Sequence, residues 1–289
     1  MGSRRFGNRV VETSNEDKVL FPDAALTKGA LVDYYDRVAE RLVPHLRDRP
    51  LVVQRFPDGI GAQGFYQKQV PAHAPDWIDT VDVPVASRGG TQRLVVCNSR
   101  ATLVWLANQA CVALHPWLSR VDRLDRPDQL VVDLDPPGDD FDAARRAALR
   151  VRALFDELDL PCYAKATGST GVHVVVPLDR RAGFDRVRAF ARAAMAVLAG
   201  RHPDELTTEQ RKAKRRGRVY LDVGRNAFAQ TAVAPFSVRP RPGAPIALPV
   251  AWWQLERAGT GPRDATARDV FRRIAQRDDP WRGWRNTSR

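Results

Sequence analysis

Strand-length apolar runs alternate with amphipathic helical segments through most of the chain, and this alternation restricts the fold more than any other feature of the sequence. Residues 27–46 place apolar side chains at helical spacing behind Thr27, which can cap the helix. Residues 172–177 (VHVVVP) have the length and β-branched content of a buried strand. Because helices and strands do not follow one another in strict βαβ units, the sequence predicts an α/β (α+β) fold with a mixed sheet.

The expected elements cover most of the 289 residues. Helices are expected at residues 27–46, 100–114, 141–158, 184–199, 250–258 and 266–277, with Asp139 or Asp140 capping the third. Strands are expected at residues 51–53, 93–97, 130–134, 172–177 and 219–222. The Pro-rich stretch 235–249 is expected to be extended. No internal repeat or long linker divides the chain, so we expect one domain over residues 1–289, with an N-terminal part at about 1–120 and a core at about 121–289.

Composition narrows the classes of partner. Lys and Arg outnumber Asp and Glu by 46 to 34, and the resulting net charge of +12 attracts polyanions, nucleic acid first and an anionic membrane second. An arginine-rich solvated surface would give the same composition. The three cysteines form no CxxC pair, which indicates a reducing compartment and excludes an obvious zinc ribbon. No apolar run is long enough to span a bilayer, so we expect a cytoplasmic protein without a membrane partner.

The segment VVDLDPP carries the strongest chemical signal. On a strand, Asp133 and Asp135 point to the same face while Leu134 points to the core. Two carboxylates this close repel each other unless a proton or a cation lies between them, and hard divalent ions suit such a pair. Asp222 ends another apolar strand segment, VYLD, and has the side chain needed to complete a two-metal site. A polar strand end followed by a turn would give the same pattern, and the sequence does not place Asp222 near the pair.

A Gly/Ser/Thr-rich turn precedes the strand that carries His173, in the segment KATGSTGVHVVVPL. Backbone N–H groups of such a turn can bind phosphate oxygens, and His173 then faces a ligand, although a satisfied core histidine is the common alternative. His115 is expected to end a helix and could cap it. Arg225 and Arg239 follow in LDVGRN and SVRPRPGAP, and arginine suits bidentate phosphate recognition. The basic run 211–218, which includes Arg215, is expected to contact a nucleic-acid backbone or to be a solvated helix end.

Taken in order, the motifs resemble the polymerase domain of bacterial ligase D (LigD), within the archaeo-eukaryotic primase superfamily. The resemblance extends from Asn15 to about Trp253. It rests on SNEDKVLFP, RFPDG with GFYQK, LHPW, VVDLDPP, TGSTGVH, VYLDVGRN and APFSVRPRPGAP, in that order. It implies a primase-polymerase with an RRM-like catalytic core and an N-terminal DNA-contacting module. Such an enzyme adds NTPs or dNTPs, with NTPs favoured, at DNA gaps or broken ends, as in non-homologous end joining.

The resemblance also implies roles for the residues that match its motifs. The metal-binding and catalytic residues would be Asp133, Asp135 and Asp222, holding two Mn²⁺ or Mg²⁺ ions. The nucleotide-binding residues would be His115, Thr167, Ser169, Thr170, His173, Arg225 and Arg239. The DNA-binding residues would be Asn15, Lys18 and Lys28, in a pocket for a 5′-phosphate, together with Arg55, Phe65, Tyr66 and Arg215. The implied partners are DNA with a 5′-phosphate, Ku and a DNA ligase, and the implied location is the bacterial nucleoid.

The chain departs from the family pattern at several points. Thr170 stands where family turns often carry Lys, and Thr167 stands where they often carry Ser, so a cation is lost and a hydroxyl is kept. The Cys/His zinc element of many replicative primases and the KxDG motif of ligases are missing from the sequence. Three other readings share part of the pattern: a DxD glycosyltransferase with Mn²⁺ and a nucleotide sugar, a non-catalytic 5′-phosphate end-binding module, and a two-metal nuclease.

Overall fold

The computed structural model describes residues 2–85, 89–257, 259, 261, 263–275 and 279–284. The chain forms two compact units. The first comprises Met1–Asp122, Val233–Ile246 and Thr266–Arg268, and the second comprises Arg123–Ala232, Ala247–Ala265 and Asp269–Arg289. Within the part of the chain that the structure describes, no helix is both long and apolar enough to cross a membrane.

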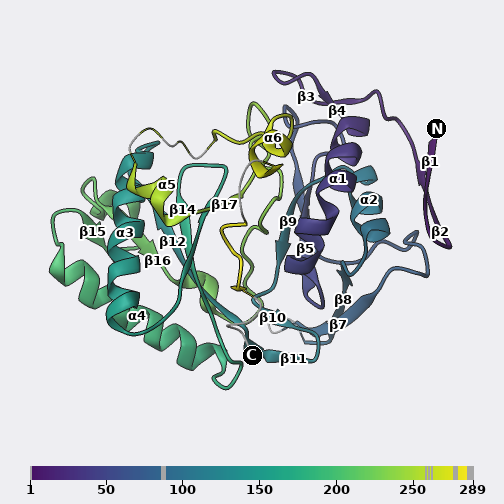
Figure 1. Ribbon diagram of the computed structural model, residues 1–289. Helices are drawn as coiled ribbons and strands as arrows, with labels where there is room; N and C mark the ends of the chain where they lie inside the picture. The colour runs from purple at the N-terminus through teal and green to yellow at the C-terminus, as the bar shows by residue number, and fades with distance from the viewer. Residues whose placement is uncertain are drawn as a thin grey trace. The chain divides into compact units, whose positions relative to one another are not determined.

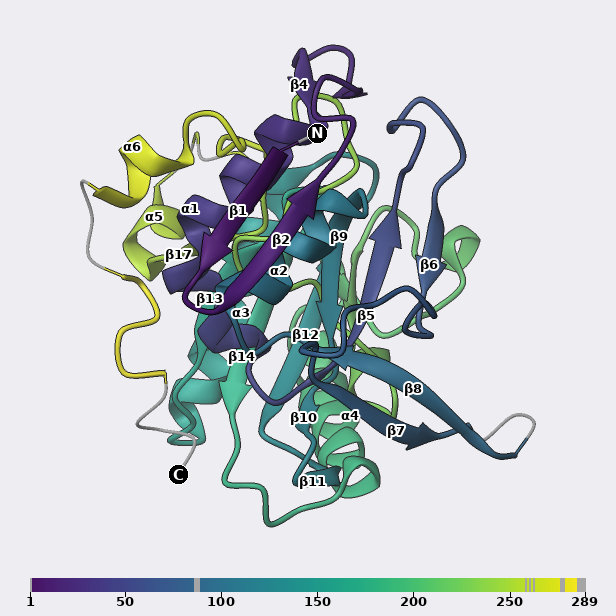
Figure 2. The same ribbon diagram turned by 90° about the vertical axis from the view of Figure 1, so that its right-hand side faces the viewer.

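The first unit is built around strand β5. Its elements are β1 (Gly2–Phe6), β2 (Arg9–Thr13), β3 (Val19–Phe21), β4 (Leu26–Thr27), α1 (Lys28–Leu46), β5 (Pro50–Arg55), β6 (Phe65–Gln67), β7 (Thr80–Pro84), β8 (Thr91–Val96), α2 (Arg100–Asn108), β9 (Cys111–Pro116) and β10 (Ser119–Arg120). Strand β5 pairs with β6, β8 and β9, and β7 extends the sheet beyond β8, all antiparallel. Helices α1 and α2 pack together, and the β1–β2 hairpin lies against α2 (Figure 2).

Two buried tyrosines of α1 fix the segment Val233–Ile246 in the first unit. The Tyr34 hydroxyl donates to the Phe236 carbonyl at 2.7 Å. The Tyr35 hydroxyl donates to the Val112 carbonyl at 2.7 Å and accepts from the Val238 amide at 3.1 Å. Each hydroxyl thus satisfies backbone groups that burial would otherwise leave unpaired. Burial raises the pKa of Tyr35 well above its usual range, so the hydroxyl remains a donor.

The second unit is a six-stranded sheet with two long helices on one face (Figure 1). Its elements are β11 (Arg123–Pro127), β12 (Gln129–Asp135), α3 (Phe141–Glu157), β13 (Tyr163–Ala166), β14 (Val172–Pro177), α4 (Phe184–Arg201), β15 (Leu206–Thr207), η1 (Lys212–Lys214), β16 (Val219–Asp222), η2 (Gly224–Asn226), β17 (Leu248–Val250), α5 (Trp252–Glu256) and α6 (Val270–Ala275). The strand order is β15-β16-β12-β14-β13-β17, with β15 and β16 parallel and the other pairs antiparallel. The mixed α/β class expected from the sequence is therefore confirmed.

Alternating burial along β12 gives the sheet two different faces. Leu130, Val132 and Leu134 pack into a core with α3 and α4. Asp133 and Asp135 alternate with them, so both carboxylates lie on the face opposite the helices. The helix expected at 141–158 forms as α3, and the Asp140 side chain accepts the Ala143 amide at 2.9 Å as its N-cap.

The helix expected at residues 100–114 is wrong in its second half. Helix α2 ends at Asn108, Ala110 adopts a positive φ of 56°, and Cys111 begins strand β9. A fully apolar run has no periodicity that separates a buried strand from a buried helix, and here pairing with β5 decides for a strand. His115 therefore lies on a strand and caps no helix.

Several other ranges also differ from expectation. Residues 235–249 form turns and an isolated Val238–Ile246 bridge before β17, because Gly243 at a φ of 82° reverses the chain, so this stretch is not continuously extended. The C-terminal helices are shorter than expected, at Trp252–Glu256 and Val270–Ala275, and residues 258, 276 and 277 of the expected ranges lie outside the described residues. The short strands β1 to β4, β6 and β7 were not expected from the sequence.

Candidate active site

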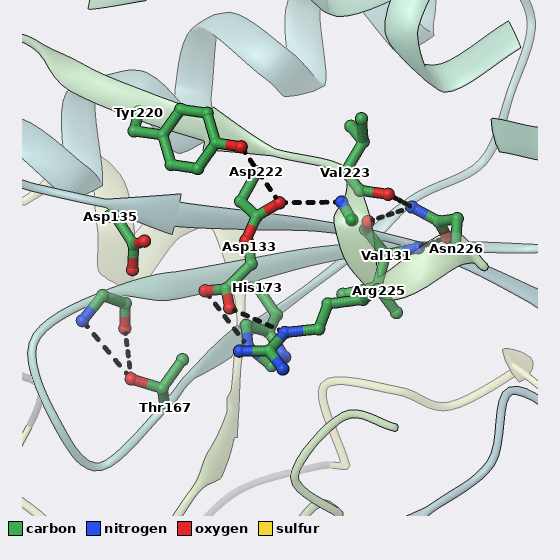
Figure 3. A network of polar contacts seen from close by, with 12 residues as sticks. Val131, Asp133, Asp135, Thr167, His173, Tyr220, Asp222, Val223, Arg225 and Asn226 are labelled. Atoms are coloured by element: carbon green, nitrogen blue, oxygen red, sulfur yellow. Dashed lines mark hydrogen bonds and ion pairs between the residues drawn. The ribbon is translucent and has the colours of Figure 1, made fainter. Parts of the chain in front are cut away.

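The strand register of the second unit places three aspartates and a histidine together (Figure 3). On β12, Asp133 lies opposite His173 of β14 on one side and opposite Asp222 of β16 on the other. Asp135 lies opposite Tyr220. Directly opposed residues of antiparallel strands share a face, with Cβ atoms about 4.5 to 5.5 Å apart. The side chains that the sequence offered as separate carboxylate motifs thus form one cluster on the face away from α3 and α4.

Asp133 is buried and is held by two basic side chains. His173 places Nε2 3.3 Å from Asp133 Oδ1, and Arg225 Nε donates to Asp133 Oδ2 at 3.4 Å. Burial alone would raise the pKa of Asp133, but His173 and Arg225 outweigh it and hold that pKa well below its usual range. Burial also lowers the pKa of His173, which favours the neutral imidazole with its proton on Nε2. The buried Nδ1 of His173 has no partner within the described chain.

Asp135 has the opposite electrostatic character. Burial, and after it the neighbouring charges of Asp133 and Asp222, raise the pKa of Asp135 to about 6, against the weaker opposing effect of Arg215 and Arg225. The nearest cation is Arg215, whose Nη1 lies 3.9 Å from Asp135 Oδ2. Asp135 thus lies near two other carboxylates, and the neighbouring arginines do not fully neutralise their negative charge. A cation would bind favourably there.

The third aspartate has its own hydrogen bonds. Asp222 Oδ1 accepts the Gly224 amide at 2.7 Å and the Tyr220 hydroxyl at 3.3 Å. Arg215 stacks over the Tyr220 ring at 4.2 Å and donates to the backbone carbonyls of Glu209 and Gln210. The sequence suggested that Arg215 contacts a nucleic-acid backbone, and the structure places it beside the carboxylate cluster.

The donor set suits a hard divalent cation, because three carboxylates lie on neighbouring strand positions and one of them resists ionisation for lack of positive charge. Among the described residues, however, no three such ligands are already arranged to hold a metal ion. The oxygens of Asp133 and Asp222 instead contact Arg225, His173 and the Gly224 amide. Binding a metal would require these side chains to exchange those contacts for the ion.

The raised pKa of Asp135 leads to a prediction about stability. Because the folded-state pKa of about 6 exceeds the ordinary value of 3.8, the folded chain binds more protons than the unfolded chain between about pH 4 and 6, and stability falls as pH rises through that window. Asp135→Asn should therefore stabilise the metal-free protein at pH 7.5 and have little effect near pH 4. The side chain is 44% exposed, so solvent screening limits the gain to about 1 kcal/mol or less.

Urea unfolding in the presence of a chelator, at both pH values, measures this difference. Asp125→Asn is the matched control, because Asp125 is 72% exposed and pairs with Arg126 outside the cluster. Equal stability of wild type and Asp135→Asn at pH 7.5 would contradict the raised pKa.

The turn between β13 and β14 is held in shape by its own threonine. The buried Thr167 hydroxyl donates to the Gly171 carbonyl at 3.0 Å and accepts the amides of Ser169 and Gly171 at 3.4 and 3.3 Å. A Cβ on Gly171 would lie 2.2 Å from the Leu134 carbonyl oxygen, so glycine lets the turn sit against the end of β12. The half-buried side chains of Ser169 and Thr170 make no hydrogen bond to another described residue, which leaves their hydroxyls for a ligand.

Asn226 is a site residue that sequence reasoning missed. Its buried side chain accepts the Val131 amide at 2.8 Å and donates to the carbonyls of Val131 and Val223 at 2.7 and 3.0 Å. These bonds tie η2, which carries Arg225, to β12, which carries Asp133. The only sequence signal was an Asn directly after an Arg in VGRN, and that signal does not identify its partners.

In the first unit, the residues expected at a 5′-phosphate pocket lie together. The Lys18 amide donates to the Asn15 carbonyl at 3.1 Å, and the Lys28 amide donates to the Lys18 carbonyl at 2.8 Å. Lys28 is buried and its Nζ donates to Ser14 Oγ at 3.3 Å, whereas Lys18 Nζ contacts Asp58 at 2.7 Å. Burial lowers the pKa of Lys28, Glu16 opposes that shift, and the nearby charge of Lys18 adds to it. Two cations close enough to affect each other form a site that favours an anion.

The aromatic residues expected at the DNA surface are exposed at β6. Phe65 and Tyr66 are 47% and 59% exposed. Arg55 lies over the Phe65 ring at 5.6 Å and donates to the Gln109 carbonyl and to Gln67, both at 2.7 Å. His115 packs edge-on against Tyr66, with ring centroids 5.7 Å apart.

Arg239 also belongs to the first unit. Its amide donates to the Pro245 carbonyl at 2.7 Å, inside the turn-rich segment that the tyrosines of α1 hold. The same segment contacts the strand of His115, because the Leu114 amide donates to Ser237 Oγ at 2.9 Å. The expected nucleotide-binding residues are therefore divided between the units: His115 and Arg239 lie in the first, and the others lie in the second.

Comparison with known proteins shows the family to which the chain is similar. The family model of the LigD primase-polymerase domain matches residues 27–281. The multifunctional non-homologous end joining protein LigD of Mycolicibacterium smegmatis is 34% identical over 248 residues, which are 85% of this chain and 32% of that protein. The LigD of Pseudomonas aeruginosa is 32% identical over 99% of this chain and 34% of its own length, and the bifunctional LigD of Bacillus subtilis is 31% identical over 92% and 42%.

A solved structure also matches. The polymerase domain from Mycobacterium tuberculosis ligase D, in complex with DNA, is similar with a TM-score of 0.87 and 29% identity, covering 94% of this chain and 96% of that one. The chain spans well under half the length of the curated relatives named above, but nearly the whole of this polymerase domain. With its aspartate cluster, the chain therefore belongs to the LigD primase-polymerase domain family and is a primase-type nucleotidyltransferase.

Proposed function

We propose that this chain adds nucleotides to a DNA primer strand under the direction of a template, at gaps or broken ends that present a 5′-phosphate. The observation that carries the proposal is the row of Asp133, His173 and Asp222 across three paired strands, with Asp135 beside it and its pKa raised to about 6. A DxD glycosyltransferase would not need the third aspartate. A purely end-binding module would not need a concentration of negative charge on a surface that meets DNA.

Asp133, Asp135 and Asp222 would hold the divalent ions, Mn²⁺ or Mg²⁺, which would activate the attacking hydroxyl and stabilise the charge on the leaving pyrophosphate. In the reaction, a bond forms between the primer O3′ and the α-phosphorus, the bond from that phosphorus to the β-phosphate bridging oxygen breaks, and the hydroxyl proton passes to water. The chain itself mainly positions the reacting groups and neutralises the negative charge of the phosphates.

We assign the triphosphate to the side chains around the turn between β13 and β14. The Ser169 and Thr170 hydroxyls would donate to phosphate oxygens, and Arg225 would move from Asp133 to the nucleotide. His173 keeps a neutral ring against Asp133 and so fixes the orientation of that carboxylate. The resemblance to the family adds His115 and Arg239 to the proposed nucleotide-binding residues. Preference for NTPs over dNTPs is part of the proposal, and equal incorporation of the two would remove it.

The likeness to LigD proteins supports a place in end joining, with Ku and a DNA ligase as partners and the bacterial nucleoid as the location. End joining is the function of relatives that are more than twice as long as the segment matched by this chain. Co-purification with Ku or with a ligase, using the intact protein in which this chain occurs, tests that part of the proposal separately from the polymerase activity.

The 5′-phosphate pocket gives a direct test. We expect Lys18→Ala with Lys28→Ala to reduce the preference for gapped DNA with a 5′-phosphate over the same gap with a 5′-hydroxyl by about 10-fold or more, because two charge-assisted hydrogen bonds are lost. Gap binding by fluorescence anisotropy and primer extension on both substrates measure it.

The matched control removes two lysines elsewhere, with Lys212→Ala and Lys214→Ala in the exposed η1 turn. That variant should weaken binding to both gaps equally and leave the preference intact. If the Lys18 and Lys28 variant behaves in the same way, these residues supply only non-specific charge. Tight binding by the wild type without any extension would favour the end-binding module.

A further inference from the structure

A pocket of the second unit lies beside the aspartate cluster and has Asp222 of that cluster in its lining. It has a volume of about 370 Å³ and is lined by Asp222 and Tyr220 of β16, by Arg188 and Arg192 of α4, and by Gln210. Its place follows from the sheet. Strand β15 pairs with β16 only at Val219 and Tyr220. On that side of β16, no described strand pairs with Leu221 and Asp222. The pocket occupies the space that a longer β15 would fill.

The two arginines of this pocket differ in exposure, since Arg188 is half-buried and Arg192 is exposed. Arg188 and Arg192 lie four residues apart on α4 and therefore on one face of the helix. Neither side chain makes a hydrogen bond or ion pair with another residue of the described ranges, and Arg188 Nε is buried without a partner. By contrast, Arg201 of the same helix pairs with Glu157 at 2.8 Å. A buried donor without an acceptor costs free energy, so its retention beside an active site points to a ligand that supplies the acceptor.

Charge and chemistry define the class of ligand. The lining of the pocket includes two guanidinium groups and one carboxylate, Asp222, which already accepts the Gly224 amide and the Tyr220 hydroxyl. Guanidinium groups bind phosphate oxygens in a fork, and Gln210 adds a neutral donor and acceptor. The pocket therefore suits a phosphate group of a nucleotide or of a nucleic-acid strand.

The direction of the reaction indicates whether the phosphate in this pocket belongs to a nucleotide or to a nucleic-acid strand. In phosphoryl transfer the attacking and leaving oxygens are roughly in line. The turn between β13 and β14, assigned above to the triphosphate, lies on the β14 side of β12, and the pocket lies on the β16 side. A strand whose 3′-hydroxyl attacks the α-phosphate from opposite the triphosphate approaches over β16.

We propose that Arg188 and Arg192 bind a backbone phosphate of the strand being extended, close to its 3′ end, and so hold the primer terminus at Asp222. This inference rests on the proposed assignment of the active site. Leaving pyrophosphate is the competing occupant, because its oxygens can accept the same hydrogen bonds from the two guanidinium groups. The two sources differ in which substrate loses affinity when the arginines are removed.

The test is Arg188→Ala with Arg192→Ala. We expect KM for the primer-template to rise about 10-fold, with KM for the nucleotide and kcat nearly unchanged, and the salt dependence of DNA binding to fall by about one to two charges. Arg188→Lys with Arg192→Lys should keep most of the salt dependence. Arg146→Ala with Arg186→Ala is the matched control, since both side chains are exposed on α3 and α4 and neither lines the pocket.

Anisotropy with a single-stranded oligonucleotide and no nucleotide supplies a readout independent of catalysis. Weaker oligonucleotide binding by the alanine variant than by the control supports the pocket even if the wild type extends no primer, which separates this inference from the proposed function. Pyrophosphorolysis completes the test. A rise in KM for pyrophosphate with an unchanged KM for the primer would overturn the proposal, and so would equal oligonucleotide binding by the alanine variant and the control when circular dichroism shows both folded.

Discussion

Asp133→Ala with Asp135→Ala should lower template-directed primer extension by about 10³-fold or more while DNA binding persists. A loss of 10³ corresponds to about 4 kcal/mol of transition-state stabilisation, the range expected when the groups that neutralise developing charge are removed. Asp133 occupies the centre of the strand row, and burial together with the charges of Asp133 and Asp222 raises the pKa of Asp135. Removing both leaves Asp222 alone, which cannot hold a divalent ion with comparable affinity.

The measurement is extension of a labelled primer across a short gap with a 5′-phosphate, in Mn²⁺ or Mg²⁺, with NTPs or dNTPs. The matched control is Asp125→Ala with Asp156→Ala, which removes two exposed carboxylates of the same unit, each paired with an arginine. The control should extend the primer like the wild type, because exposed ion pairs contribute little. Retention of more than a tenth of the wild-type rate by the active-site variant would place the chemistry elsewhere.

Binding of the same gap discriminates between an enzyme and a binding module. Loss of two negative charges near DNA should leave affinity unchanged or raise it slightly. A variant that binds the gap normally and adds no nucleotide is the result expected for an enzyme whose metal ligands have been removed. Wild-type protein that shortens labelled DNA without nucleotide would instead support the nuclease reading, and transfer from a nucleotide sugar would support the glycosyltransferase.

The carboxylate cluster shows how far local sequence patterns reach. The two-residue period of a strand placed Asp133 and Asp135 on one face, and the structure has that geometry. Their proximity to Asp222 depends on which strands pair and in which register. The core that β12, β14 and β16 share with α3 and α4 determines this pairing and register. The short segment VYLD contains no pattern from which the pairing could be predicted. The resemblance to a family supplied what periodicity could not.

The stretch after Asn108 shows the opposite limit. Residues 111–116 are entirely buried, so no polar face reveals whether the period is 2 or 3.6. Pairing with β5, more than fifty residues earlier in the chain, makes this stretch a strand. His115 therefore lies on that strand, opposite Val52. The partners of Arg215 were also invisible in a run of basic residues. Tyr220 and Asp135 hold it because the chain folds back from η1 into β16.

Asn226→Ala should destabilise the protein by about 3 kcal/mol and also lower activity by 10-fold or more. The side chain is 1% exposed and makes three hydrogen bonds to the backbone of Val131 and Val223. Removing it leaves a buried amide and carbonyls without partners, and each such group costs about 1 to 3 kcal/mol. The loss of activity has a separate cause, because η2 would no longer be fixed to β12 and Arg225 would lose its position beside Asp133.

Two comparisons make this prediction specific. Asn226→Asp keeps the acceptor for the Val131 amide but turns a buried carboxylate oxygen toward two carbonyl oxygens, so at neutral pH its free energy of unfolding should be no higher than that of Asn226→Ala. Asn98→Ala removes a part-buried asparagine of the first unit that also makes hydrogen bonds, to Asp48 and Asp79, and should cost about 1 kcal/mol without affecting extension. Urea unfolding and steady-state extension measure the two effects. If Asn226→Ala were no less stable than Asn98→Ala, the bonds between η2 and β12 would not support the site, and the orientation of Arg225 would have to come from its contact with Asp133 alone.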